Sequence, residues 1–500
     1  MIKCGLFALL PGLEKLFNII LSSGLYPHNW FNGYVIPIFK SGDCDDPNNY
    51  RGITITSCLA KLFNSILNNR LEKFLKLNSI ISDEQIGFKS GCRTSDHIFK
   101  IKTVLDKYLK KLKKIYACFI DLKKAFDSVL HAALFIRLME VGIGGKFITI
   151  LRSMYSNIEL RVRVSSYYLS DLFPSSKGVF QGDNLSPNLF NVFINDIVKS
   201  FDESCKPISL GSKPVSCLLY ADDLLLISET ETGLQNCMDK VFNYCSTWGL
   251  DINYQKTKVM VFNRGSKLHT PKLLINGHEI ESVNQYKYLG VLFSLNGNFK
   301  CALNDVYSGG QKTFFKITNL FKNIPCDINN FMYIFDHTVK PVLLYSSEIL
   351  GMFNIKSAKK HSGKDDVFEQ IYNLLPAEKL NLTMCRYLLG VNKKTCKLAL
   401  YGELGRYPLY INIIMNMIKY WLRLYQNTGE DSLLHEALAE NIGMVNNNQD
   451  CWLSCIENIF NECSLSHLYR NPRSIRNKNL LAVKKFLETQ FEKKLVSKTE

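Results

Sequence analysis

Three aspartates in two remote segments are the side chains of this sequence that are best suited to chemistry. Asp222 and Asp223 are adjacent within the apolar run 218–227, and Asp121 ends a second apolar segment, 115–121. Both segments predict buried strands, and the Asp222-Asp223 pair predicts a tight turn. A buried, unpaired carboxylate takes up a proton or binds a cation. A polar hairpin tip in a buried sheet is the alternative interpretation of the pair.

If the strands pair, the three carboxylates meet at one edge of a sheet. They cannot all stay ionised there without a counter-charge, and oxygen-rich anionic ligands suit Mg²⁺. Two such ions about 4 Å apart can activate an attacking hydroxyl and stabilise a leaving oxygen. The net charge of +16 suggests a polyanionic partner. Phosphoryl transfer on a nucleic acid is therefore the predicted reaction.

The composition is that of a globular protein. Of the 500 residues, 46% are hydrophobic and 21% are charged, which excludes a disordered chain and allows two to four domains.

A membrane surface is the competing partner for the positive charge, but no run of ~18 apolar residues predicts a spanning helix. The 16 cysteines lack a framework spacing, and the signal-like start is interrupted at Pro11. Both features predict a protein of the cytoplasm or nucleus that is not secreted.

A mixed framework of strands and helices must position the aspartates. Besides 115–121, strands are predicted at 34–39, 158–164, 259–262 and 288–293, and Asn276-Gly277 predicts a hairpin turn. Helices are predicted at 12–23, 59–75, 128–141, 186–201 and 234–248. From about residue 300 the pattern changes to long helical segments, interrupted by a predicted linker at 354–366 that is rich in Lys, Ser, Gly and Asp.

The motifs around the aspartates resemble those of reverse transcriptases, in the order of that family. Residues 119–127 resemble its first catalytic motif, 178–187 its second and 220–223 its third. Residues 255–258 and 288–290 are similar to the fourth and fifth motifs. The segments 36–43, 49–53 and 82–88 are typical of non-LTR (LINE-type) retrotransposon reverse transcriptases. The resemblance is strong over residues 12–300 and weaker downstream.

The resemblance implies a role for each matching residue of the metal and sugar sites. Asp121 and Asp222 would bind both Mg²⁺ ions, with Asp223 beside them, and the backbone carbonyl of Leu122 would complete a metal shell. Phe126 would be the steric gate that leaves no room for a 2′-hydroxyl group. An ordinary core aromatic is the alternative for Phe126.

The remaining roles concern the nucleotide and the primer. Gln181 would line the nucleotide and template pocket, and Lys40 and Arg51 would contact the triphosphate. Lys256 would lie near the leaving pyrophosphate, with Lys258 as a competitor. Tyr288, Leu289 and Gly290 would form the primer grip. The alternative for Gln181 is a plain loop glutamine, and the alternative for Lys40 and Arg51 is solvated surface charge. The alternative for the primer grip is a simple core strand.

The resemblance also implies the fold and the activity. We expect an α+β right-hand polymerase, with a palm β-sheet backed by helices, fingers, and a helical thumb and C-terminal region. The expected domains are an N-terminal helical segment at 1–30, fingers and palm at 31–298, a thumb-like region at 299–400 and a C-terminal region at 401–500. The expected activity is RNA-directed DNA synthesis from an RNA template, a DNA primer and dNTPs. The oligomeric state stays open.

Three other functions compete with this one. They are a catalytically inactive, nucleic-acid-binding remnant of a truncated retroelement, an RNA-synthesising polymerase, and a structural protein. The bulky Phe126 opposes the second, and the three aspartates oppose the third.

Two features depart from the family pattern. Few residues precede the fingers segment, so we expect the usual N-terminal endonuclease domain to be lacking. Cys451, Cys455, Cys463 and His467 have ligand types that suit zinc. The apolar residues between them follow helical spacing, which would hold Cys451 too far from His467 to share an ion. We therefore expect a buried helix with inert cysteines.

Overall fold

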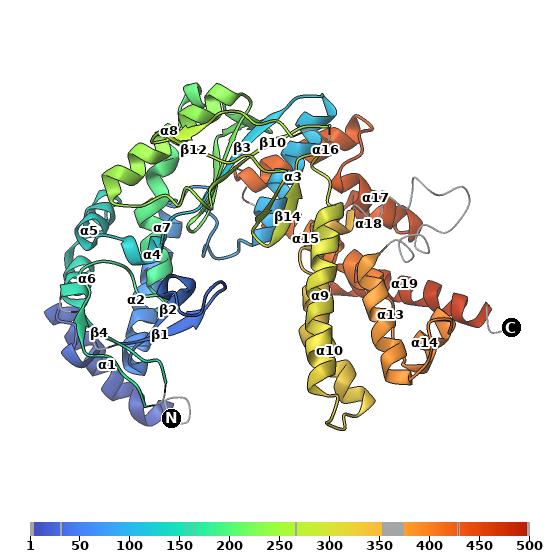
Figure 1. Ribbon diagram of the computed structural model, residues 1–500, viewed down its shortest axis with the longest axis horizontal. Coiled ribbons are helices and arrows are strands. Elements are labelled where there is room, and N and C mark those ends of the chain that lie inside the picture. Colours follow the sequence, from blue (N-terminus) through green and yellow to red (C-terminus); the bar gives the residue numbers. More distant parts are fainter. Residues whose placement is uncertain are drawn as a thin grey trace.

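The computed structural model describes residues 5–30, 33–156, 158–165, 167–265, 268–352, 375–427, 429 and 431–497. Its elements form an arch, with β1 and β2 on one side, α9 and α10 on the other, and the sheet that holds β3 and β10 joining them (Figure 1). The predicted linker at 354–366 lies outside the described residues. Among the described helices, none combines the length and the apolar character needed to cross a bilayer.

A four-stranded antiparallel sheet, here called the central sheet, lies at the middle of the molecule. Its strand order is β10-β3-β9-β8. The strands are β3 (Ile115–Ile120), β8 (Cys217–Tyr220), β9 (Asp223–Ser228) and β10 (Lys258–Phe262). The predicted strands at 115–121 and 259–262 and the predicted turn at Asp222 are confirmed.

Both faces of the central sheet are buried, because successive side chains of a strand point to opposite faces. Ala117 and Phe119 of β3 belong to a first hydrophobic core. Cys118 and Ile120, which alternate with them, belong to a second core. This double burial explains why the strands are continuously apolar in sequence.

Helices cover the second-core face of the central sheet. On that face α8 (Glu231–Trp248) begins at Thr230, whose hydroxyl accepts a hydrogen bond from the Gly233 N–H at 3.0 Å. Its buried residues Leu234, Met238 and Val241 recur at helical spacing, as predicted. The predicted helix at 186–201 forms α7 (Ser186–Ile194), which continues as a 3₁₀ helix over Asn195–Ser200.

A second four-stranded sheet forms one side of the arch. Its strand order is β2-β1-β4-β5. The strands are β1 (Gly33–Phe39), β2 (Tyr50–Ile55), β4 (Glu159–Val162) and β5 (Phe173–Pro174). The helices α1 (Leu6–Ser23), α2 (Cys58–Leu77) and α6 (Gly145–Ser156) lie in the same arm. The predicted strand at 34–39 and the predicted helix at 59–75 are confirmed.

Two predicted elements differ from the observed ones. The helix predicted at 128–141 forms α5 (His131–Glu140), which begins three residues later than predicted because it is divided from a short preceding helix, α4 (Ala125–Ser128). The division has a tertiary cause, since the Val129 carbonyl accepts a hydrogen bond from the Gly178 N–H at 2.8 Å. The strand predicted at 288–293 is a hairpin of β13 (Gln285–Tyr288) and β14 (Val291–Ser294), because Leu289 and Gly290 have φ angles of +46° and +76°. The turn predicted at Asn276-Gly277 is confirmed, with φ angles of +48° and +78°.

The C-terminal part is helical and packs on the central sheet. It contains α9 (Lys300–Leu320), α10 (Ile328–Leu343), α13 (Pro376–Leu389), α14 (Lys397–Glu403), α15 (Leu409–Asn427), α16 (Leu433–Asn446), α17 (Trp452–Glu462), α18 (Ser466–Arg470) and α19 (Asn477–Ser497). The first core runs without interruption from Ile98 and Phe119 to Phe491 of α19. It therefore joins the two regions into one packed unit of an α+β fold, as predicted.

The cysteine-rich segment forms the helix that its spacing predicts. Cys451 precedes α17 and Cys463 follows it, and both side chains are buried. The Cys451 thiol contacts the Asn441 carbonyl at 3.6 Å, while His467 is exposed on α18. Within the described part of the chain, these residues form no cluster with metal-binding geometry.

Candidate active site

The central sheet brings the three aspartates to one end. In the pairing of β3 with β9, Ile120 is opposite Leu224, so the next residues, Asp121 and Asp223, face each other across the strands. Asp222 lies in the two-residue turn that joins Tyr220 to Asp223. Side chains of directly opposed residues lie on the same face of a sheet. All three aspartates line one cleft with a volume of about 1400 Å³.

Burial and neighbouring negative charge raise the pKa values of Asp222 and Asp223. Burial, and then the Asp121 charge, raise the pKa of Asp222. The positive charges of Arg51 and Lys40 partly offset this increase. Burial, and then the charges of Asp222 and Asp121, raise the pKa of Asp223 to about 6. The three carboxylates line one cleft, and oxygen-rich anionic side chains are a donor set that fits a hard divalent cation. The family-implied metal therefore fits these residues chemically.

Asp121 is fixed by a short extended segment beside it. The Asn253 side-chain amide donates to the Asp121 carboxylate at 3.0 Å, and the Asn253 N–H donates to the Asp121 carbonyl at 2.8 Å. Leu122 forms an antiparallel bridge with Ile252. Because the Asp121 C=O faces Asn253 and the Lys123 N–H faces Asp251, the intervening C=O of Leu122 points to the opposite side. In the strand order β10-β3-β9-β8, that side is the side of β9.

Phe126 lies in α4 at the wall of the cleft. Its ring stacks on the buried ring of Phe190, with centroids 4.4 Å apart and an interplanar angle of 16°. The Phe88 ring meets it edge-on at 6.1 Å. A ring held from two sides has little freedom to move aside, which is what a steric gate requires. Phe126 is partly buried, packs against the second core and also lines the cleft, so its role as a gate stays a prediction beside the core-aromatic alternative.

Gln181 lines the same cleft and joins three segments. Its side-chain amide donates to the Asp127 carboxylate at 3.0 Å, and its carbonyl accepts from the Thr54 N–H of β2 at 2.7 Å. The loop that carries the second motif is therefore attached both to the first motif and to the second sheet.

Basic residues reach the cleft from two directions. Lys40 and Arg51, from the β1–β2 hairpin, are exposed and line the cleft. Lys256 also lines it. The Lys258 ammonium instead donates to Glu281 and to the Gln255 carbonyl, both at 2.6 Å. Lys256 thus lines the cleft while Lys258 is engaged by other groups, and the pyrophosphate role of either lysine stays a prediction.

The residues predicted as a primer grip do not line the aspartate cleft, but Tyr288 is near enough that burial, and then the charge of Asp223, raise the pKa of its hydroxyl. Tyr288 is buried in the first core, and Leu289-Gly290 form the β13–β14 turn. The Tyr345 hydroxyl, which follows α10, donates to the Leu289 carbonyl at 2.8 Å. This turn therefore joins the central region to the base of the α9–α10 pair.

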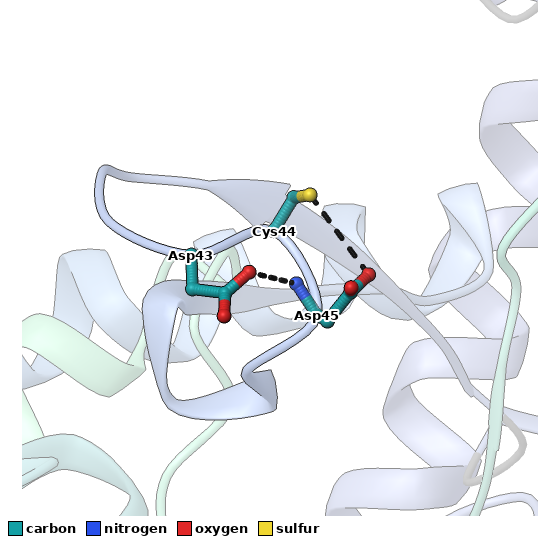
Figure 2. A group of neighbouring side chains, drawn as sticks. All are labelled: Asp43, Cys44 and Asp45. Carbon is teal, nitrogen blue, oxygen red and sulfur yellow. Dashed lines mark hydrogen bonds between the residues drawn. The ribbon is translucent and has the colours of Figure 1, made fainter.

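A second group of metal-ligand types lies in the β1–β2 loop. Figure 2 shows Asp43, Cys44 and Asp45, whose ligand atoms lie within 4.8 Å of one another. It is the one such group of three in the described ranges, so the ligand atoms of Asp121, Asp222 and Asp223 do not all lie within 4.8 Å of one another. All three residues are exposed, and Asp43 accepts from the Asp45 N–H at 3.0 Å within the loop itself. None of the three residues lines the cleft of Asp121, Asp222 and Asp223.

Sequence reasoning missed two residues that position the site, Asn253 and Gln85. Asn253 precedes the predicted fourth motif by two positions, but its pairing with Asp121 spans 132 residues. Gln85 belongs to the segment 82–88 that was assigned to the fingers, yet its side chain contacts the turn at Ala221.

Comparison with known proteins gives one family. Residues 38–293 match the family described as "Reverse transcriptase (RNA-dependent DNA polymerase)". The Pol polyprotein of the type-2 retrotransposable element R2DM of Drosophila melanogaster is 27% identical over 295 residues, which are 57% of this chain and 27% of that protein. The probable RNA-directed DNA polymerase from transposon BS of the same species is 28% identical over 356 residues, which are 68% of this chain and 38% of that protein.

Other relatives share less sequence. The RNA-directed DNA polymerase from mobile element jockey of Drosophila melanogaster is 24% identical, over 70% of this chain and 38% of that protein. The chain thus spans less than two fifths of the length of each of these three relatives. Among solved structures, apo telomerase from Candida tropicalis is 14% identical, covering 86% of this chain and 74% of that one, with a TM-score of 0.41.

Proposed function

The chain belongs to the reverse transcriptase family, and from that premise we propose that it is an RNA-directed DNA polymerase of a LINE-type mobile element. The proposed reaction is attack of a DNA primer 3′-hydroxyl on the α-phosphate of a dNTP, directed by an RNA template, with release of pyrophosphate. The observation that carries the proposal is the single cleft lined by Asp121, Asp222 and Asp223 together with basic and aromatic side chains of the expected kinds.

The carboxylates define the reaction centre. Asp121, Asp222 and the Leu122 carbonyl would hold two Mg²⁺ ions, with Asp223 beside them. Bound there, the ions would supply Lewis-acid chemistry, which makes the attacking hydroxyl more acidic and offsets charge on the leaving group. Asn253 would keep the Asp121 carboxylate oriented through its two hydrogen bonds.

The remaining residues would bind and select the substrate. Lys40 and Arg51 would bind the triphosphate, and Lys256 would lie near the pyrophosphate. Phe126, held by Phe190, would exclude a 2′-hydroxyl group. Gln181 would shape the pocket for the nucleotide and template, and the β13–β14 turn at Tyr288, Leu289 and Gly290 would support the primer.

The domain roles follow from this assignment. The central sheet would be the palm, the second sheet with its helices the fingers, and α9 with α10 the thumb. We keep the boundaries near 31, 298 and 400 as part of the proposal. The pair α9–α10 and the second sheet lie on opposite sides of the arch, which supports these roles because a bound duplex would lie between thumb and fingers (Figure 1).

Primer extension tests the proposal. The purified chain should extend an oligo(dT) primer on poly(rA) with dTTP and Mg²⁺, and Asp222→Asn with Asp223→Asn should abolish the signal. Asp239→Asn, which removes an exposed carboxylate from α8, is the matched control and should retain activity. Equal signals from wild type and the double variant would overturn the proposal. A wild type that binds the duplex without extending it would establish the inactive remnant instead.

A further inference from the structure

The turn that carries Asp222 has a backbone conformation that needs support. Ala221 has a φ of +58°, in the left-handed region that residues with a β-carbon rarely adopt. The residue is buried, with only 3% of its surface exposed. Its N–H and C=O groups must therefore find partners within the protein.

One side chain satisfies both groups. Gln85 is completely buried, and its side-chain oxygen accepts a hydrogen bond from the Ala221 N–H at 3.0 Å. Its side-chain nitrogen donates to the Ala221 carbonyl at 3.4 Å. The same oxygen accepts from the Gly87 N–H at 2.8 Å. Only a side chain with both a donor and an acceptor can make this pair of contacts, which suits glutamine.

The segment 84–88, here called the clamp loop, is itself fixed to the central sheet. It extends along the open edge of β8, where the Leu219 N–H donates to the Glu84 carbonyl at 2.9 Å and the Ile86 N–H donates to the Leu219 carbonyl at 3.1 Å. On the other side, the Asn191 side chain of α7 donates to the Gly87 carbonyl at 2.7 Å. Gln85 is thus presented to Ala221 from a rigid support.

The approach of the clamp loop to the turn leaves no spare room. A β-carbon added at Gly87 would lie 2.2 Å from the Ala221 nitrogen, far inside contact distance. The next residue, Phe88, has a φ of +56°, and its ring meets the Phe126 ring edge-on. The clamp loop therefore touches the turn of Asp222 at one end and the gate ring at the other.

We propose that Gln85 is a positioning residue of the polymerase, which fixes the Ala221 backbone and thereby the place of the Asp222 carboxylate relative to Asp121 and the Phe126 ring. This inference rests on the proposed function and adds to it a residue that touches no substrate. A displaced carboxylate weakens metal binding and the chemical step more than it weakens the binding of the template–primer duplex.

The test compares Gln85→Met with wild type and with Gln235→Met. Gln235 is a matched control, because its side chain likewise pairs with both backbone groups of one residue, Leu274, at 2.7 and 2.9 Å, but it lies on α8 away from the cleft. We expect Gln85→Met to lower kcat by about 10- to 100-fold and to raise the Mg²⁺ concentration for half-maximal rate. The dNTP KM and the duplex Kd should stay within about twofold of wild type, and Gln235→Met should match wild type in all four values.

A second substitution separates positioning from general loss of stability. Glycine adopts positive φ without a steric penalty, so Ala221→Gly introduced into Gln85→Met should recover a large part of kcat. The variant Gln85→Glu keeps the acceptor and loses the donor, and it replaces Gln85→Met if that variant does not fold. The proposal would be overturned if a folded Gln85 variant kept the kcat and the metal dependence of wild type. It would also be overturned if Ala221→Gly restored no activity to Gln85→Met.

A readout without catalysis keeps this proposal distinct from the polymerase assignment. The rise in the thermal unfolding midpoint on adding Mn²⁺ should be large for wild type and Gln235→Met and small for Gln85→Met. If wild type shows no extension, the polymerase assignment fails, and the Mn²⁺ shift still decides the role of Gln85. Equal Mn²⁺ shifts for wild type and Gln85→Met would then refute it.

Discussion

Although Asp223 is exposed to solvent at the end of β9, partial desolvation, and then the charges of Asp222 and Asp121, raise its pKa from 3.8 to about 6. The folded protein therefore takes up this proton near pH 6, and the unfolded chain takes it up only near pH 3.8. Stability is consequently lost as the pH rises through 6 and is fully present below 3.8. In metal-free buffer, the thermal midpoint of wild type relative to Asp223→Asn should thus increase as the pH falls from 7 to 5.

Thermal unfolding in EDTA at several pH values measures this difference. Mg²⁺ should act in the opposite sense, because it binds the ionised carboxylates, so its stabilising effect should shrink as the pH falls. A midpoint difference between wild type and Asp223→Asn that does not change with pH would contradict the altered acidity.

Phe126 gives a second prediction at this scale. Phe126→Ala removes the ring that Phe190 and Phe88 hold in place, so ribonucleotides should enter the pocket. The preference for dTTP over UTP, measured as the ratio of kcat/KM values, should fall roughly 10- to 100-fold. Phe126→Tyr keeps the ring and is the control. Unchanged sugar selectivity in Phe126→Ala would assign the gate to another residue.

The sequence predicted the residues whose position depends on local spacing, and it missed those that depend on remote partners. The aspartates, Phe126 and Gln181 could be found because short motifs hold them. Gln85 could not be assigned its contact with Ala221, which spans 136 residues. Likewise, the choice between Lys256 and Lys258 was open because it depends on Glu281, on a separate segment.

At the scale of elements, α3 (Thr94–Lys110) and α15 are joined by a buried ion pair. The Arg423 guanidinium contacts the Asp96 carboxylate at 2.6 Å, and only 2% of the Asp96 side chain is exposed. Arg423→Met would leave that carboxylate buried and unpaired. We expect a loss of about 3 kcal/mol in the free energy of unfolding, measured with urea.

The controls for this prediction use a surface pair and a double variant. Lys240→Met breaks the ion pair with Asp202, whose side chain is 60% exposed, and should change the free energy of unfolding far less than Arg423→Met does, because solvent screens the pair. Adding Asp96→Asn to Arg423→Met should recover part of the loss, because the unpaired charge is removed. Similar decreases in the free energy of unfolding for Arg423→Met and Lys240→Met would show that the buried ion pair stabilises the fold no more than the exposed one.

Most elements of the central region were predictable because their apolar periodicity is strong. The α8 helix, the central strands and the hairpin turns are of this kind. The break between α4 and α5 was not predictable, because it depends on the Val129 carbonyl pairing with Gly178 of a distant loop. The β13–β14 turn was missed because Leu289 in a left-handed conformation has no signal of its own in the sequence.

At the scale of the whole molecule, the net charge of +16 predicts how duplex binding responds to salt. Neutralised phosphates release counterions, so log Kd for an RNA–DNA template–primer should rise linearly with log salt concentration. If about six phosphates are contacted, affinity should fall roughly 10³-fold between about 50 and 200 mM salt.

Fluorescence anisotropy with a labelled duplex measures this dependence. The double variant Lys40→Gln, Arg51→Gln should affect dNTP use far more than the salt slope, because these two residues lie in the nucleotide cleft. A duplex affinity that is insensitive to salt would contradict a binding surface built mainly on charge.

The α+β class and the change to helices near residue 300 followed from the sequence, but the attachment of the C-terminal helices to the central sheet did not. That attachment depends on individual pairs, such as the Lys107 ammonium with Glu440 at 2.8 Å, between segments that no local pattern connects. The apolar residues in the C-terminal helices predicted that these helices are buried on one side. They did not indicate which surface of the molecule the helices pack against.

The double burial of the central sheet has a consequence for how such a chain diverges over evolutionary time. A side chain on either face of β3 or β9 is committed to one of two cores, so most exchanges there alter packing that reaches the aspartates within a few residues. Descendants of a common ancestor should therefore keep these strands while their exposed loops drift. Ranking positions by variability across many descendants would expose the sheet as the slowest-changing part of the molecule.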